Sequence, residues 1–306
     1  MNLTTTSPNE TRPVLNRYWW SCLRTLFLLL LLYSAGCATR GGFGLNNFHS
    51  RPPVFTFHST KSEVFAHLNR TSQHVHGWRS LNCNVRPRQI PMKFNAIVAC
   101  ESSMKFRTIV SSIRGREMDF GSNDQYFWFW ANEGSDKPLL YSLHQNLPTA
   151  QTHLPIPFNP EWLMEVMGVV PFDESEFQME YKPQDSTINL VNATSDSQGR
   201  TVYRRIIVDA QSGNIKKHEM YGAQQELIAT ATMGNYKAVG PNQVNMPHQI
   251  YLEWPQTEMA FDLRFPAIQI NPDSSDNDGQ WEIPRITKNV IDIGSIRALP
   301  ASFQQR

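Results

Sequence analysis

The chain has 306 residues and a formal net charge of +1, with 28 Lys and Arg residues against 27 Asp and Glu residues. It therefore lacks the basic excess that would neutralise a phosphate backbone, and this argues against nucleic-acid binding. Eight Trp and 17 Phe residues can fill a sizeable core, while 20 Pro residues favour a β-rich, loop-rich protein over a helical bundle. The length suits one large domain or two small ones.

The N-terminus has the pattern of an export signal. Arg17 and Arg24 precede the apolar run 26–33, and small residues then lead to Cys37. A basic flank, a short apolar core and small residues at a cleavage site are typical of a signal peptide. The apolar run is too short to cross a bilayer, which takes about 20 apolar residues. We therefore expect residues 1–36 to be removed on export.

Cys37 is the candidate lipid-attachment residue, because a cysteine directly after small residues looks like the acylation site of a bacterial lipoprotein. Ser34 stands three places before it, where that motif usually has Leu, Val or Ile. Ordinary cleavage after Gly36, leaving a soluble protein, is therefore the alternative. The lipoprotein interpretation predicts a lipidated N-terminus and spacer over residues 37–58, followed by one domain over residues 59–306.

The first predicted element of that domain is a short amphipathic helix over residues 60–71. Thr60 and Glu63 have the spacing of a capping box, and the apolar residues Val64, Phe65 and Leu68 follow on one face. Beyond this helix the apolar residues recur at every second position, as in strands with one apolar and one wet face. The clearest alternating segments are 81–85, 94–100, 104–107, 177–181 and 261–265.

Short turns rich in Gly, Asn, Asp and Ser separate these segments and favour antiparallel meanders. One helix interrupts the series over residues 161–167. Asn159 can cap it, Pro160 suits its first position and Gly168 can end it. Its side chains are mostly apolar, so we expect the helix to pack on the sheet.

Cys83 and Cys100 lie on the apolar sides of two neighbouring predicted strands. A hairpin that turns around Arg88 and Gln89 offsets the two residues by about five positions, roughly 16 Å of strand. This distance is too long for a disulfide bond. We therefore predict two buried free thiols, with a disulfide as the alternative if the two strands are joined asymmetrically.

The run 126–130, Tyr-Phe-Trp-Phe-Trp, is apolar on both faces. Such a strand is covered on both sides, or one of its sides faces something other than water. It is therefore either a central strand between a helix and a sheet, or a strand with one face lining an apolar cavity.

Motifs for chemistry are sparse. The sequence has neither a phosphate-binding glycine loop nor a Gly-x-Ser-x-Gly elbow. His67, His74 and His76 lack a partner carboxylate or cysteine at a recognised metal-binding spacing, and the acidic segment 273–279 lacks the full pattern of a calcium loop. We expect no catalytic residues, no cofactor and no metal site. A hydrolase whose residues converge only in three dimensions is the less favoured alternative.

The order of several segments resembles a known superfamily. Residues 119–124 run into the aromatic run, 160–168 form the second helix, and 207–213 and 220–222 follow in the second half. This order is similar to the outer-membrane lipoprotein-sorting proteins, which comprise the carrier LolA, its receptor LolB and related anchored lipoproteins. The resemblance spans about residues 60–295.

The resemblance implies a mainly β fold: a single unclosed, curved antiparallel sheet, or half-barrel, with short helices capping its concave side. The family's cavity holds acyl chains. The resemblance therefore implies an anchored lipoprotein of the cell envelope, held at the outer membrane and facing the periplasm. Its expected partners are the membrane, an acyl chain of a lipid or lipoprotein, and other lipoprotein-transport components. A structural or interaction lipoprotein with a filled cavity is the alternative.

The resemblance also implies site residues. The helix over 161–167 would act as a lid. Arg107 is the candidate for the arginine that tethers the lid in the carrier. The candidates for the cavity lining are Phe94, Val98, Phe106, Trp128, Trp130, Trp162, Met164 and Met167.

Overall fold

The computed structural model describes residues 52–295 except 103, 155–158, 196–198 and 274–278. The chain divides into two units, Met1–Arg51 and Pro52–Arg306, and the described residues belong to the second. The predicted signal peptide and Cys37 lie outside the described residues and stay predictions. Within the described part of the chain, no helix is both long and apolar enough to cross a membrane.

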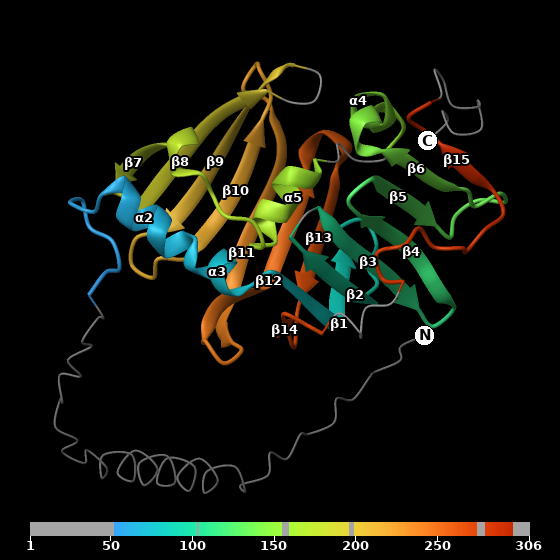
Figure 1. The fold of residues 1–306 in the computed structure, drawn as a ribbon, viewed down its shortest axis with the longest axis horizontal. Helices are drawn as coiled ribbons and strands as arrows, with labels where there is room; N and C mark the ends of the chain where they lie inside the picture. Colours follow the sequence, from blue (N-terminus) through green and yellow to red (C-terminus); the bar gives the residue numbers. More distant parts are fainter. Residues whose placement is uncertain (1–51, 103, 155–158, 196–198, 274–278, 296–306) are drawn as a thin grey trace, which may run out of the picture. The chain divides into compact units, whose positions relative to one another are not determined.

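One sheet contains all fifteen strands of the described residues, and it is built from two antiparallel meanders (Figure 1). The first meander comprises β1 (Gly77–Pro87), β2 (Phe94–Glu101), β3 (Lys105–Ser112), β4 (Gly115–Ser122), β5 (Tyr126–Ala131) and β6 (Leu139–Leu143). The second comprises β7 (Gln178–Lys182), β8 (Thr187–Ser195), β9 (Thr201–Asp209), β10 (Ile215–Tyr221), β11 (Leu227–Val239), β12 (Val244–Trp254) and β13 (Met259–Arg264).

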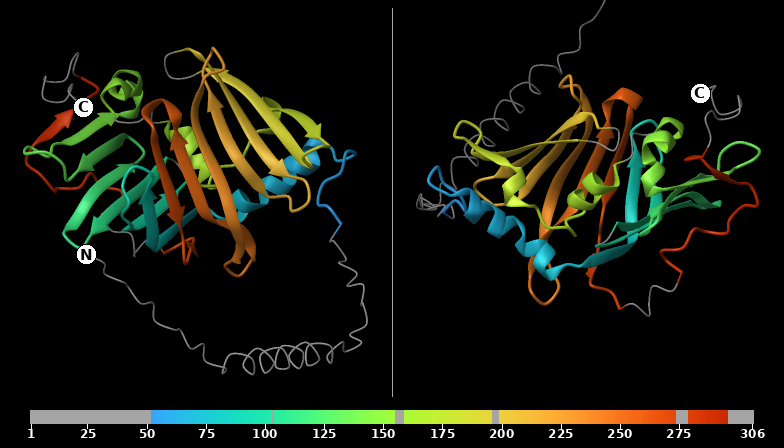
Figure 2. Two further views of the ribbon diagram at one scale, coloured as in Figure 1. Left: turned by 180° about the vertical axis from the view of Figure 1, so that it is seen from behind. Right: turned by 45° about the horizontal axis from the view of Figure 1, so that its top comes forward.

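The pairing of β1 with β13 joins the two meanders, with Val85 opposite Leu263. The strand order is therefore β15-β6-β5-β4-β3-β2-β1-β13-β12-β11-β10-β9-β8-β7, and its two ends do not pair. The sheet curves around the helices (Figure 2). The predicted unclosed β half-barrel is confirmed. Two short strands modify it, since β15 (Val290–Asp292) runs parallel to β6 and β14 (Gln269–Ile270) pairs with β1.

The chain must cross the sheet between β6 and β7, because these strands lie at opposite sides of it. The crossing segment carries α5 (Pro160–Val166) over the concave face (Figure 1). Asn159 caps α5 by accepting a hydrogen bond from the Trp162 backbone N–H at 2.8 Å. Gly168, at φ +73°, follows its end, so the predicted helix is confirmed. The other short helical elements of the crossing are η1 (His144–Asn146), α4 (Leu147–Ala150), η2 (Gln151–His153) and η3 (Glu174–Glu176).

The N-terminal helix is also confirmed, although it is divided into α2 (Lys61–Leu68) and α3 (Arg70–His74). Both bonds of the capping box form, since Thr60 accepts from the Glu63 N–H at 3.3 Å and donates its own N–H to the Glu63 carboxylate at 2.7 Å. The buried face of α2 packs against apolar residues of β8 and β9. The second meander thus has its own apolar cluster beneath α2.

Cys83 and Cys100 are buried and free, as predicted. Cys83 pairs with Ala96 across the β1–β2 hairpin, so it lies four positions along β2 from Cys100. Burial raises the pKa of the Cys83 thiol to about 12. A thiol held in its protonated form is a poor nucleophile, so these residues act as small core side chains.

Gly121 on β4 allows the Trp128 ring of β5 to lie directly over the backbone. A Cβ at position 121 would stand 2.3 Å from Cζ2 of Trp128. We expect Gly121→Ala to displace this ring and to lower the free energy of unfolding by about 1–3 kcal/mol, measured by chemical denaturation. The matched control is Gly234→Ala on β11, where the new Cβ would meet nothing within 4 Å. An equal effect of both substitutions would contradict the steric explanation.

Candidate functional site

An apolar cavity of about 530 Å³ lies between α5 and the concave face of the sheet. Both meanders contribute to it, with Phe106 of β3, Phe120 of β4 and Phe129 of β5 on one side and Leu252 of β12 and Phe261 of β13 on the other. Its volume falls in the range of about 300–1,000 Å³ that is common for ligand pockets. The cavity is the candidate functional site.

The predicted lining residues divide into three groups. Phe94, Phe106, Trp162 and Met167 line the cavity. Val98 and Met164 are buried in the core beside it. Trp128 and Trp130 lie on the opposite face of β5, in a separate cluster with Leu139.

The expectation for Trp128 and Trp130 must therefore be corrected. Side chains alternate along a strand, and Phe129 is the member of this run that lines the cavity. Both faces of β5 are covered, as its sequence indicated, but different structures cover them. The cavity and core lie on one side, and the C-terminal segment with Ile283 and Ile286 lies on the other.

Sequence reasoning missed much of the opposite wall, including Leu252 and Trp254 of β12. Their alternation with polar neighbours was available as a signal for a strand. The pairing that brings β12 and β13 beside β1 depends on contacts between distant parts of the chain. No local pattern reveals such a pairing.

Helix α5 is attached to the sheet at two points. Trp78 of β1 donates its indole N–H to the Met167 carbonyl at 2.9 Å, just beyond the end of α5. Arg204 of β9 forms an ion pair with Glu165 of α5 and also contacts Glu176 Oε2 at 3.1 Å. These contacts link α5 to both meanders.

Arg107 does not contact α5, and the expected tethering role must be corrected. Its guanidinium forms a two-point ion pair with Asp119, at 3.1 and 2.9 Å. Nη1 donates to the carbonyls of Gly279 and Gln280, at 3.3 and 2.8 Å. Because Phe106 points into the cavity, the next residue of β3 points to the outer face. Arg107 therefore fastens the C-terminal segment.

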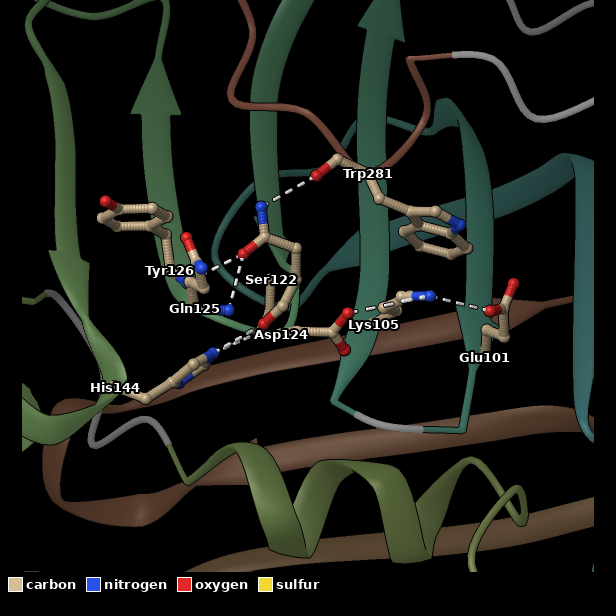
Figure 3. Close-up of polar contacts among 9 residues, drawn as sticks. Glu101, Lys105, Ser122, Asp124, Gln125, Tyr126, His144 and Trp281 are labelled. Carbon is tan, nitrogen blue, oxygen red and sulfur yellow. Dashed lines mark hydrogen bonds and ion pairs between the residues drawn. The ribbon is translucent and has the colours of Figure 1, made fainter.

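The C-terminal segment 279–292 crosses the outer face of the first meander. Figure 3 shows Trp281 of this segment together with Asp124 and Gln125 of the turn between β4 and β5. In this turn, Nδ2 of Asn123 donates to the Trp281 carbonyl at 3.0 Å. The same side chain accepts hydrogen bonds from the backbone N–H groups of Gln125 and Tyr126, at 2.9 and 2.8 Å. One Asn thus shapes a turn of the sheet and holds the segment that covers it.

Asp119 is the centre of this outer-face network. Its carboxylate is fully buried and accepts from Arg107, from Arg116 at 2.8 Å and from the Trp128 indole N–H at 3.0 Å. We expect Asp119→Ala to lower the free energy of unfolding by about 3–5 kcal/mol, because it leaves the Arg107 charge buried and unpaired. Chemical denaturation measures the effect. Arg116→Gln is the control, and we expect it to cost at most about 1 kcal/mol because Arg116 is 36% exposed.

Two titratable groups, one on α5 and one on β10, have strongly shifted pKa values. Burial raises the pKa of Glu165 to about 7, although the nearby Arg204 opposes this shift. Burial lowers the pKa of His218 on β10 to about 3, and Arg204 lowers it further. The two shifts have opposite consequences for stability, since a buried group favours its neutral form in each case.

The free energy of unfolding of the wild type should therefore combine two opposing pH dependences, one from Glu165 and one from His218. The contribution of Glu165 to the free energy of unfolding is present below pH 4.5 and is lost as the pH rises through about 7. The His218 contribution is present above pH 6.5 and is lost as the pH falls through about 3. Between pH 4.5 and 6.5, we expect Glu165→Gln to make stability rise more steeply with pH, and His218→Gln to make it fall. Urea denaturation at several pH values measures both slopes, and unchanged slopes would contradict this assignment.

No protein-family model and no curated protein matches the chain. Among solved structures, it is similar to an outer membrane lipoprotein-sorting protein domain from Vibrio parahaemolyticus, with a TM-score of 0.50 and 12% identity over 72% of this chain and 98% of that one. A DUF1329 family protein from Desulfovibrio piger has a TM-score of 0.46 and 9% identity, over 72% of this chain and 96% of that one. A LolA superfamily protein from Nitrosomonas europaea has a TM-score of 0.44 and 12% identity, over 72% of this chain and 97% of that one.

At these identities the similarity concerns the fold alone. The half-barrel with helices across its concave face is the fold that the resemblance in the sequence predicted. The described part of this chain has the fold of an outer-membrane lipoprotein-sorting domain.

Proposed function

We propose that this protein is a non-enzymatic, membrane-anchored lipoprotein of the cell envelope whose cavity binds an acyl chain of a lipid or lipoprotein. The apolar cavity of about 530 Å³ carries the proposal. An acyl chain leaving a membrane needs an apolar site, because burial contributes about 0.8 kcal/mol per methylene group. Anchorage through Cys37 at the outer membrane, facing the periplasm, and work with other lipoprotein-transport components complete the proposal.

The composition of the wall supports reversible binding. Met118, Met167 and Met259 line the cavity from β4, the lid and β13. Methionine side chains are flexible and polarisable, so they can repack around chains of different shape. The lid helix itself forms one wall through Trp162, Leu163 and Met167, and its movement would open the cavity.

The turns at one end of strands β1 to β4, beside the cavity, have the chemistry of a membrane-facing surface. Ile90 and Met92 in the β1–β2 turn are 44% and 55% exposed, and Ile113 in the β3–β4 turn is fully exposed. The two turns are neighbours, because Asn95 pairs with Ser111 at the adjoining ends of β2 and β3. Ile90 also lines the cavity, so the exposed apolar surface of these turns is continuous with the candidate site.

Basic residues flank these exposed apolar side chains, namely Lys93 and Arg114. Apolar side chains can enter the headgroup region, while basic ones attract anionic lipids. This combination supports entry of the acyl chain from a membrane surface at these two turns.

Filling the cavity should weaken binding. The probe is 1-O-hexadecyl-lysophosphatidylcholine, added to purified, delipidated protein and monitored by native mass spectrometry and titration. We expect the wild type to bind one molecule saturably and Thr108→Trp, which places an indole inside the cavity, to weaken binding at least about tenfold. Ile97→Trp on the exposed side of β2 is the matched control and should bind normally. A wild type that never binds, or a Thr108→Trp variant that binds equally well, would reject the acyl-binding function.

The anchor needs its own experiment. Mass spectrometry of the N-terminal peptide of the processed protein should find Cys37 carrying a diacylglyceryl group. An unmodified Cys37 at the mature N-terminus would indicate a soluble carrier and would leave the cavity's function intact.

A further inference from the structure

A second cavity, of about 200 Å³, adjoins the apolar cavity beneath α5. Its lining includes Leu147 of α4, Val202 of β9 and Met220 of β10, which do not line the larger cavity. Among the described residues, Asn159 and Trp162 are the two that line both cavities. The Asn159 side chain is engaged in capping α5. Trp162 is therefore the side chain placed to divide the two cavities.

Between the two cavities the sheet presents small side chains. β11 separates β12, which lines the larger cavity, from β10, which lines the smaller one. Ala231 of β11 pairs with Leu252, and Ala229 pairs with Met220. Cross-strand partners lie on the same face of a sheet, so both alanines lie on the concave face, and both are fully buried. Over this low floor, a large side chain from α5 is needed to separate the cavities.

The Trp162 ring is held by packing. Its indole N–H has no hydrogen-bond partner among the described residues, whereas the indole N–H groups of Trp78, Trp128 and Trp130 each donate a hydrogen bond. The ring packs edge-on against Trp254 of β12, with centroids 6.4 Å apart and planes at 73°. A side chain that borders a void lacks contact atoms on that side. Displacing this ring therefore costs less than displacing one in a close-packed core.

From this arrangement we infer that Trp162 is a partition between the two cavities and sets the longest acyl chain that the protein accommodates. The inference rests on the proposed acyl-binding function and names the residue that determines its specificity for chain length. A bound chain lies in the larger cavity and its end meets the indole ring. When the ring is removed, the chain end extends over Ala229 and Ala231 toward Val202 and Met220.

The size and chemistry of the smaller cavity limit this extension. Its volume is less than half of that of the larger cavity, so it has room for a few methylene groups and not for a second full chain. Leu147, Val202 and Met220 are buried apolar residues that can cover the end of a chain. The polar lining residues are Asn159, Glu161, Thr194, Ser195 and Arg204.

A series of lysophosphatidylcholine alkyl ethers, from dodecyl to eicosyl, tests the inference. Binding to purified, delipidated protein is measured by titration below the critical micelle concentrations. In the wild type, the dissociation constant should fall about fourfold for each added methylene group up to a limiting chain length, and then stay constant. Trp162→Ala and the milder Trp162→Leu should move this limit to longer chains by a few methylene groups. Comparing successive probes within one variant removes any loss of affinity that is common to all probes.

Filling the smaller cavity supplies the matched control. Val202→Phe should leave the limiting length of the wild type unchanged and should restore that length in the Trp162→Ala background. Leu163 also lies on α5 but lines the larger cavity and not the smaller one. The limiting length of Leu163→Ala should therefore be insensitive to Val202→Phe. Circular dichroism and thermal unfolding identify the variants that fold, and Trp162→Leu decides the test if Trp162→Ala does not.

The outcomes distinguish the partition from acyl binding itself. A limiting length that stays unchanged in the folded Trp162 variants, or an extension that survives Val202→Phe, overturns the inference and leaves acyl binding standing. The same holds for a wild type whose affinity keeps rising through the eicosyl ether. Failure of the wild type to bind any probe of the series removes the proposed function instead.

Discussion

The pairing of β1 with β13 is the constraint on which the rest of the architecture depends. It places the first strand of the first meander beside the last strand of the second. The far strands of the two meanders, β6 and β7, are therefore consecutive in the sequence but lie far apart in the sheet. The segment between β6 and β7 must then pass across the sheet. That passage carries α5 over the concave face, and the cavity forms between this helix and the strands.

The two faces of the first meander are specialised by simple alternation. Phe106, Phe120 and Phe129 point inward and form a cavity wall, while the residues between them point outward. The outward set includes Arg107 and Asp119, whose buried ion pair sits beneath the C-terminal segment. A buried ion pair of this kind favours one arrangement of the chain because either partner alone would be costly. The outer face thus holds the sheet in shape while the inner face remains available for a ligand.

The polar groups near α5 are arranged differently from those of the outer face. Arg204 and Trp78 attach α5 to both meanders through a few contacts, and Glu165 is buried with a pKa near neutrality. In the proposed function α5 acts as a lid, and a helix that moves must be held by contacts that can be broken and reformed. A small number of polar attachments over an apolar wall meets this requirement better than a continuous apolar interface.

The sequence by itself determined the local elements. The capping box at Thr60, the Asn159 cap with Gly168, and the alternation of strands follow from contacts within a few residues. The β1–β2 register, and with it the free state of Cys83 and Cys100, follows from a short hairpin. Residue order also indicated the half-barrel, through resemblance to a known superfamily.

Only the tertiary structure decided which face of each strand became the cavity. The run 126–130 is apolar on both sides, so its sequence could not show that Trp128 and Trp130 lie beneath the C-terminal segment. Arg107 was likewise assigned to the lid, although its partners are Asp119 and two carbonyl groups more than 170 positions later. Local periodicity records that a face is buried, but what buries it depends on contacts between residues distant in the chain.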